Sequence, residues 1–395
     1  PFPYKGRFSL RSSLFPVLYA ILIGCLHRHD STGAQRFLAH VWKRVHLITL
    51  SEFFGLLASN PFLVLVMVLI LGTIFVNGAT DAANAIAEVV GTRSMDIDDA
   101  IMMSVVCNFV GLVAMTFIST AVADTISGMV DFGGDSHLAM IALAASTVGI
   151  VAWGVAAWVF GIPTSESHAL IAGLTGSALA VSGGLDGVNM GEWVKVLYGL
   201  VLSTVLGYLA GWIIAKIIPI ACANADRRKA NNFFGRMQIA GAAGVALMHG
   251  AQDGQKFMST AMLAIALSMG KTVGEMGGFP LWIEILCAAT MAIGTAIGGK
   301  KIIKKVGMEM VQLDKYQGFS ASISATISLF IATVTGLPVS TTHTKTAAIM
   351  GAGAAKDVRS VNWGVCKEMV LTWIFTFPGC GLIGYALAKL FLVIF

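Results

Sequence analysis

One motif occurs twice in the sequence, as Gly-Ile-Pro-Thr-Ser-Glu-Ser-His at 161–168 and as Gly-Leu-Pro-Val-Ser-Thr-Thr-His at 336–343. Each copy lies inside apolar sequence and joins two hydrophobic stretches. Gly and Pro end the incoming helix, and the Ser and Thr side chains that follow can cap the first turn of the next helix. This order predicts two re-entrant helical hairpins, whose tips direct backbone amides into the membrane interior.

The composition is that of a membrane protein that crosses the bilayer several times. The 395 residues are 56% hydrophobic and 12% charged, with a mean hydropathy of +0.80, whereas soluble domains average about 25% charged residues. Apolar stretches recur at 61–76, 100–122, 138–160, 193–219, 237–250, 257–269, 280–299, 319–335 and 365–395. We therefore expect an all-α polytopic protein of the cell membrane, embedded in the lipid bilayer.

Charge and cysteine content disfavour several other classes of protein. The net charge of +5 comes from Lys and Arg in short loops, as is usual in membrane proteins, so it does not indicate nucleic-acid binding. The six Cys residues are scattered without a Cys-x-x-Cys pair, so they predict neither disulfides nor a metal framework, and no cofactor is expected. The sequence lacks the Gly-x-x-x-x-Gly-Lys-Ser/Thr motif, which disfavours ATP-driven transport.

A second motif is repeated at almost the same distance as the first. Asn-Gly-Ala-Thr-Asp-Ala-Ala-Asn-Ala at 77–85 aligns with His-Gly-Ala-Gln-Asp-Gly-Gln-Lys-Phe at 249–257. Asp81 and Asp253 are 172 residues apart, and the two Gly-x-Pro motifs are 175 residues apart. Two independent motifs at nearly one offset indicate a duplicated unit.

The duplication divides the chain into four parts. The first repeat covers 53–219, and the second covers 237–395. The basic segment at 220–236 is predicted to be a cytoplasmic linker. Residues 1–52 form a basic N-terminal extension to which we assign no role.

In both copies of the second motif, the Asp follows an apolar run and lies at a predicted break in a helix. An ionised carboxylate at membrane depth is costly unless it has a partner. We therefore interpret Asp81 and Asp253 as ligands of a cation such as Na⁺, with a proton as the alternative. Paired breaks at matching offsets are typical of secondary transporters, whose substrate site lies between the repeats.

These residues resemble the PiT family of inorganic phosphate transporters, the sodium- or proton-coupled phosphate permeases. The motifs at 77–85 and 249–257 resemble its duplicated Gly-Ala-Asn-Asp-x-x-Asn-Ala signature, and the Gly-x-Pro motifs resemble its Pro-x-Ser-Thr-Thr-His hairpins. The resemblance covers about 62–390, nearly everything outside the basic N-terminus. It implies two inverted-topology repeats with broken helices, and phosphate held between the tips of two re-entrant hairpins.

The resemblance also implies two sets of ligands. Phosphate contacts would come from hydroxyl groups at the hairpin tips, namely those of Ser165, Ser167, Ser340, Thr341 and Thr342. Ligands for the coupling ion, Na⁺ or H⁺, would come from Asp81, Asn84, Asp253 and Gln252, with Asp81 and Asp253 as the Na⁺ ligands. Two opposed helix N-termini with several hydroxyls can hold a tetrahedral oxyanion without a full positive charge.

Two positions depart from the family pattern in a way that affects charge. Lys256 stands where the first repeat has Asn84, and it would pair with Asp253 or attract phosphate. Glu166 replaces the middle Thr of the first hairpin. Because a carboxylate beside phosphate would repel it, we favour a cation-binding or proton-binding role for Glu166.

The favoured function is a secondary transporter that imports inorganic phosphate with Na⁺ by alternating access. H⁺-coupled symport of phosphate or a metal-phosphate complex, a sulfate permease and a channel remain alternatives. An intramembrane enzyme acting on a lipid phosphate is less favoured, because catalysis rarely needs two symmetric Ser/His pairs, and we predict that the chain is not an enzyme.

Four full spans in each half would give parallel repeats, so one interrupted segment in each half must cross differently. Whether copies form a homo-oligomer is left open.

Overall fold

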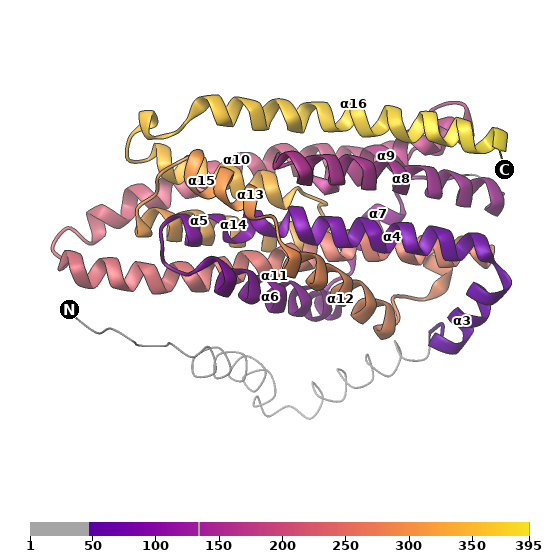
Figure 1. Ribbon diagram of the computed structural model, residues 1–395, viewed down its shortest axis with the longest axis horizontal. Helices are drawn as coiled ribbons and strands as arrows, with labels where there is room; N and C mark the ends of the chain where they lie inside the picture. Colours follow the sequence, from indigo (N-terminus) through magenta and orange to yellow (C-terminus); the bar gives the residue numbers. More distant parts are fainter. Residues whose placement is uncertain (1–46, 133–134, 395) are drawn as a thin grey trace.

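The computed structural model describes residues 47–132 and 135–394, so most of the predicted N-terminal extension at 1–52 lies outside the described residues. The helices of the first half of the chain are α3 (Leu50–Ser59), α4 (Pro61–Thr80), α5 (Ala82–Gly91), α6 (Ile97–Ile118), α7 (Ala121–Ser127), α8 (Ser136–Phe160), α9 (Glu166–Ser182) and α10 (Met190–Ala221). The helices of the second half are α11 (Arg227–Ser268), α12 (Leu281–Ile297), α13 (Lys300–Lys304), α14 (Lys315–Val334), α15 (Thr341–Ala354) and α16 (Trp363–Ile394). The long helices lie roughly along one direction, which is horizontal in Figure 1.

Six helices in the described part are long and apolar enough to cross a membrane, if α4 and α5 are counted as one span at Pro61–Gly91. The other five are α6, α8, α10, α14 and α16. A seventh candidate is α12 together with Lys300–Glu309, a pair that bends by 64°. The chain is therefore a multi-pass, all-helical membrane protein, as its composition predicts.

The Gly-x-Pro motifs end one helix and begin the next, as predicted. Gly161 follows α8 and Gly336 lies shortly after α14, both in the left-handed conformation with φ of 65° and 71°. The next helices begin at serine caps, because the Oγ atoms of Ser165 and Ser340 accept hydrogen bonds from the backbone N–H groups three residues later, at 3.3 and 3.2 Å. A non-glycine residue at either glycine would have to adopt a strained backbone.

Both pairs of helices joined by these motifs return to the end of the molecule at which they begin. Val130, before α8, forms a β-bridge with Val188, after α9. Val311, before α14, forms a β-bridge with Val361, after α15. The two pairs enter from opposite ends of the helical bundle, and their tips meet in the middle (Figure 1).

The helix break expected at Asp253 is wrong, because α11 runs without interruption from Arg227 to Ser268. At Asp81 the interruption is slight, since this residue keeps helical angles of −74° and −34° between α4 and α5. The glycines of these motifs serve packing instead. A Cβ atom at Gly78 would collide with the backbone oxygen of Met291, and one at Gly250 with that of Asn108. These glycines therefore permit close helix contact.

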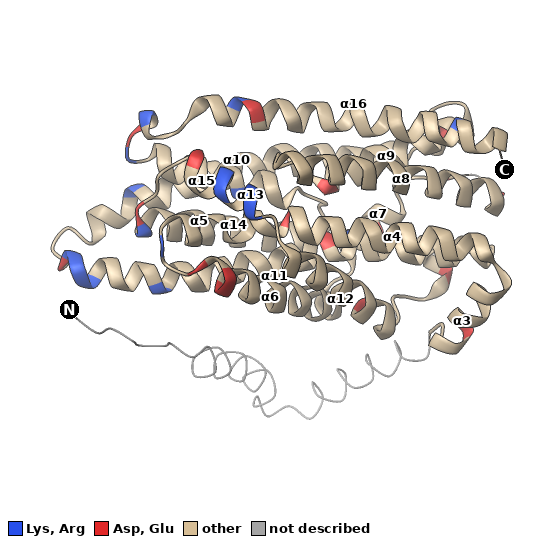
Figure 2. Cartoon of the chain, viewed as in Figure 1, with Lys and Arg blue, Asp and Glu red and all other residues tan. Residues whose placement is uncertain are grey.

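The Lys and Arg residues lie mainly at one end of the bundle (Figure 2). This end contains the connection between α10 and α11, the lysine-rich α13 and the connection between α15 and α16. Residues 227–236 of the predicted linker belong to α11 and also lie at this end. The positive-inside rule predicts that this end of the bundle faces the cytoplasm, and on this prediction we call it the cytoplasmic end.

The two helices that follow the hairpin tips exchange partners between the halves. The two most extensive helix contacts in the described part join α9 to α16 and α15 to α10. Each tip helix therefore packs against the last helix of the other half of the chain. This exchange brings both tips to the centre of the molecule, beside α4, α5 and α11.

Candidate functional site

The two hairpin tips are in direct contact at the centre of the bundle. The rings of His168 and His343 meet edge to face, with centroids 4.3 Å apart. His168 also stacks on Phe377 at 4.5 Å, and His343 stacks on Trp373 at 3.8 Å. Both rings are buried. The histidines therefore pack the two tips against each other and against α16, and a catalytic Ser/His pair is not needed to explain them.

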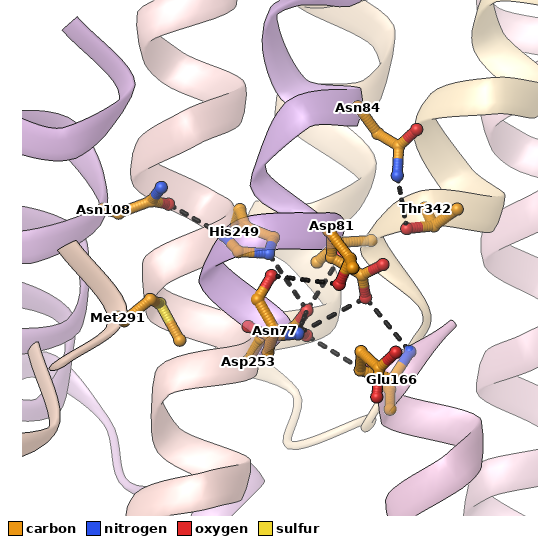
Figure 3. Close-up of polar contacts among 12 residues, drawn as sticks. Asn77, Asp81, Asn84, Asn108, Glu166, His249, Asp253, Met291 and Thr342 are labelled. Atoms are coloured by element: carbon orange, nitrogen blue, oxygen red, sulfur yellow. Dashed lines mark hydrogen bonds and ion pairs between the residues drawn. The ribbon is translucent and has the colours of Figure 1, made fainter. Parts of the chain in front are cut away.

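Two carboxylates from opposite halves of the chain lie together beside the tips (Figure 3). The Asn77 Nδ2 atom lies 3.4 Å from the Oδ2 atom of Asp81 and 3.3 Å from that of Asp253. Nε2 of His249 lies 3.3 Å from the Asp253 carboxylate. One ligand atom each from Asp81, His249 and Asp253 lie within 4.8 Å of one another, so the three residues could hold a cation.

Asp253 is also the point at which groups from both tips converge. The hydroxyls of Ser167 and Thr341 each donate to its carboxylate at 3.0 Å. Lys256, one turn later on α11, forms an ion pair with it at 2.8 Å. The same Lys256 ammonium donates to the Ser167 hydroxyl at 2.8 Å and to the Val339 carbonyl at 2.5 Å. The carboxylate thus occupies a position rich in anion-binding donors.

The first tip supplies a third buried carboxylate. The backbone N–H of Glu166 donates to Oδ2 of Asp81 at 3.2 Å, as expected at a helix N-terminus. The Glu166 side chain receives a long hydrogen bond of 3.5 Å from Thr164, and its Oε2 atom has no hydrogen-bond partner. The buried site thus contains three carboxylates and one lysine, which pairs with Asp253. This excess of negative charge favours a cation or a proton there.

The remaining predicted residues support the site less directly. Ser165 and Ser340 use their hydroxyls to cap α9 and α15. Asn84 donates to Thr342 across the two halves at 3.0 Å. Gln252 points toward the second hairpin, where its amide donates to Thr333 at 3.1 Å and to the Leu337 carbonyl at 3.3 Å.

Sequence reasoning missed Asn77 and His249 as members of the site. These two residues open the second motif in its two copies, so their positions are equivalent although their side chains differ. His249 is oriented by Asn108, whose Oδ1 atom lies 2.8 Å from its Nδ1 atom. The alignment of the two copies contained the signal, because both side chains are polar and lie one turn before an Asp.

The oxygen atoms that lack partners fit a cation site. Among the described residues, Oδ1 of Asn77, Oδ1 of Asp81 and Oδ1 of Asn84 are buried without a hydrogen-bond partner. Buried polar atoms normally have partners. Carboxylate and amide oxygens are the ligands that hard cations prefer.

The sequence profile of the Phosphate transporter family matches residues 77–225 and 220–384. The chain belongs to this family. Among curated relatives, a protein of Bacillus subtilis named probable low-affinity inorganic phosphate transporter is 36% identical over 315 residues, which cover 80% of this chain and 92% of the relative. A Rhizobium meliloti protein of the same name is 36% identical over 310 residues, covering 78% and 90% of the two chains. These matches confirm the resemblance found in the motifs of this phosphate transporter family member. The family consists of transporters, not enzymes.

A solved structure described as the sodium-dependent phosphate transporter has the same fold as this phosphate transporter family member. The two superpose with a TM-score of 0.73 over 85% of this chain and 100% of that chain, at 23% sequence identity. A putative phosphate permease of Pyrococcus furiosus, 25% identical, matches 85% of this chain and 97% of its own length. The similarity to these two proteins therefore extends over 85% of this chain.

Proposed function

We propose that this protein imports inorganic phosphate together with Na⁺. Family membership and the names of the relatives support phosphate as the substrate. The observation that carries the proposal is the meeting of two capped helix N-termini with a carboxylate pair in one buried site. The first feature suits an oxyanion, and the second suits its coupling cation.

The proposed cation site consists of Asp81 and Asp253 with the polar side chains of Asn77 and His249 beside them. Its support is the close approach of ligand atoms from three of these residues, within 4.8 Å. Na⁺ is favoured because carboxylate and amide oxygens predominate, and the solved relative is described as sodium-dependent. No cofactor is proposed.

The proposed phosphate site consists of the tip hydroxyls of Ser167, Thr341 and Thr342 with the nearby backbone amides. Ser165 and Ser340 would act by holding these amides in place, since they cap the two helices. Two of the hydroxyls now donate to Asp253. When Na⁺ takes that carboxylate as a ligand, the hydroxyls become free to donate to phosphate.

This exchange accounts for coupling between the two ligands. Na⁺ would neutralise the carboxylate and release its donors, so phosphate would bind more tightly in the presence of Na⁺. By linkage, phosphate must strengthen Na⁺ binding by the same factor. Neither ligand would then cross efficiently alone.

Alternating access between two inverted-topology repeats is the proposed mechanism. Its support is that α4 runs toward the cytoplasmic end whereas α11 runs away from it (Figure 1). The re-entrant pairs α8–α9 and α14–α15 do not cross. If the 42-residue α11 is counted as a crossing, three crossings remain in each half, namely α4–α5, α6 and α10, and then α11, α12–α13 and α16. An odd number inverts the second repeat and removes the conflict with four full spans in each half.

Uptake of radiolabelled phosphate into proteoliposomes tests the proposal, with a Na⁺ gradient, with a pH gradient and with neither. We expect uptake that needs the Na⁺ gradient and is competed by arsenate but not by sulfate. Competition by sulfate would favour a sulfate permease over a phosphate carrier. Dependence on added divalent metal would favour a metal-phosphate complex as the substrate. Absence of uptake under every gradient would contradict phosphate transport.

H⁺ coupling is the second candidate, and Glu166 is the observation that favours it. This buried carboxyl group has an oxygen without a partner and lies beside Asp81. A proton on Glu166 would remove one of the three negative charges. Uptake that follows only the pH gradient would select this alternative.

A further inference from the structure

A second buried ion pair lies outside the site described above. Nζ of Lys345, on α15, is 2.6 Å from Oε1 of Glu88, on α5. The side chains are 1% and 0% exposed. Ser322, on α14, hydrogen-bonds the Glu88 carboxylate and accepts a hydrogen bond of 3.2 Å from Lys345. Glu88 and Lys345 are thus fully desolvated and link the two halves of the chain.

The pair lies between the proposed phosphate site and the cytoplasmic end. One helical turn nearer the hairpin tips, Asn84 on α5 donates to Thr342 on α15. Beyond the pair, α5 leads to its connection with α6 and α15 leads to its connection with α16, both at the cytoplasmic end. A phosphate that left the tip of α15 for the cytoplasm along this helix would therefore pass Lys345.

The ion pair has no counterpart in the other half of the duplicated structure. The positions that correspond to Glu88, Ser322 and Lys345 at the two repeat offsets are Thr260, Thr147 and Leu170. The Thr260 and Thr147 hydroxyls donate to backbone carbonyls of their own helices. The fold is thus built without this ion pair on the external side, which indicates a role tied to the cytoplasmic side.

The chemistry of the pair suits exchange with a passing anion. A buried ammonium group requires a negative partner, and a lysine with three donors binds phosphate well as a point charge. Glu88 satisfies Lys345 with one oxygen only, since its Oε2 atom has no hydrogen-bond partner. Because this buried ion pair is costly to break without a substitute, only another anion can replace Glu88, and phosphate can offer the lysine more than one oxygen.

We propose that Lys345 is a second phosphate-binding residue on the cytoplasmic release route, and that Glu88 takes the place of phosphate there while the route is closed. This inference rests on the proposed function as a phosphate carrier. Lys345 draws phosphate off the hairpin tips when α5 and α15 separate. Glu88 then pairs with Lys345 again. This pairing displaces phosphate into the cytoplasm and closes the route.

The first test is Glu88→Gln, which removes the competing carboxylate and keeps the shape of the side chain. In proteoliposomes with the cytoplasmic face outward, we expect the KM for inorganic phosphate to fall about tenfold, within the range usual for coupling between sites. The turnover number should fall with it, because phosphate that enters from this face and is held more tightly at Lys345 passes on slowly to the hairpin tips. The matched control is Glu368→Gln, which frees Lys305 at the half-exposed Lys305–Glu368 pair of the same end and should change neither quantity.

The double variant Glu88→Gln/Lys345→Met separates phosphate binding from a structural role. If Lys345 binds phosphate, the double variant loses the tenfold gain in affinity that Glu88→Gln shows. A KM that is unchanged or raised in Glu88→Gln overturns the proposal, provided that the wild type transports phosphate. Failure of the wild type to transport phosphate would instead count against the proposed function.

Ser322→Cys tests the proposal with the ion pair intact, in case Glu88→Gln does not fold. In a variant otherwise free of cysteine, a membrane-impermeant thiol reagent is added to the cytoplasmic face. We expect slow labelling that inorganic phosphate reduces about tenfold, since phosphate on Lys345 covers this position. Labelling that is absent, or that phosphate does not alter, contradicts a phosphate position at Lys345.

Discussion

At the level of single residues, Asp253 lies between the two proposed ligand sites, because its carboxylate contacts Lys256, Asn77, His249 and a hydroxyl from each hairpin tip. Part of this arrangement was predictable. Both aspartates and the tip hydroxyls are present in the repeated motifs. The Glu88–Lys345 pair was not, since its members are 257 residues apart and lie outside the shared motif positions.

Asp253→Asn should destabilise the protein as well as abolish uptake. The variant leaves the fully buried Lys256 without its carboxylate, and breaking a buried pair costs about 3–5 kcal/mol. We expect a lower melting temperature in detergent and no Na⁺-driven phosphate uptake. The matched variant Asp253→Asn/Lys256→Met should recover stability and still fail to transport. Recovery of transport in the double variant would remove Asp253 from the cation site.

Glu166→Gln distinguishes the two coupling ions. The substitution keeps the length of the side chain and the backbone N–H that donates to Asp81. If Na⁺ alone couples transport, uptake should keep its Na⁺ dependence and change less than about threefold, the scale of a lost neutral hydrogen bond. Loss of pH-driven uptake in this variant would instead identify Glu166 as the proton carrier. The measurement is initial uptake rate against external pH, with and without Na⁺.

At the level of helices, the hairpins followed from local chemistry and the helix around Asp253 did not. Gly, Pro and serine caps act within a few residues, so their effect is readable in the sequence. Gly250 permits close packing against α6, and only the position of that helix reveals this role. A glycine that packs and a glycine that breaks a helix look the same in a sequence.

Gly250→Ala should therefore destabilise the protein without changing the chemistry of the site. Its Cβ atom would meet the backbone oxygen of Asn108, which cannot move away as a flexible side chain could. Overpacking of this kind costs about 1–3 kcal/mol. Gly55→Ala is the control, because nothing lies within 4 Å of the added Cβ atom there. Thermal unfolding in detergent should show a lower midpoint for Gly250→Ala alone.

At the level of the whole molecule, the charge distribution predicts which end faces the cytoplasm. Asn224 lies in the connection between α10 and α11, and Asp186 lies between α9 and α10 at the opposite end. In a variant otherwise free of cysteine, Asn224→Cys should react with an impermeant thiol reagent only from the cytoplasmic side. Asp186→Cys should react only from the external side. Reaction of both from one side would contradict this orientation.

Because the tip helices exchange partners between the halves, chain connections and helix contacts link the two tips in a closed circuit. The tip helix α9 packs on α16, which continues the chain from the tip helix α15, and α15 packs on α10, which continues the chain from α9. Every link in this circuit is either covalent or a large packed surface. We therefore expect a displacement of one tip to be transmitted to the other, which would oppose a path open at both ends at once. On this expectation, the order of the helices along the chain would itself limit leak, before any ion or substrate is bound.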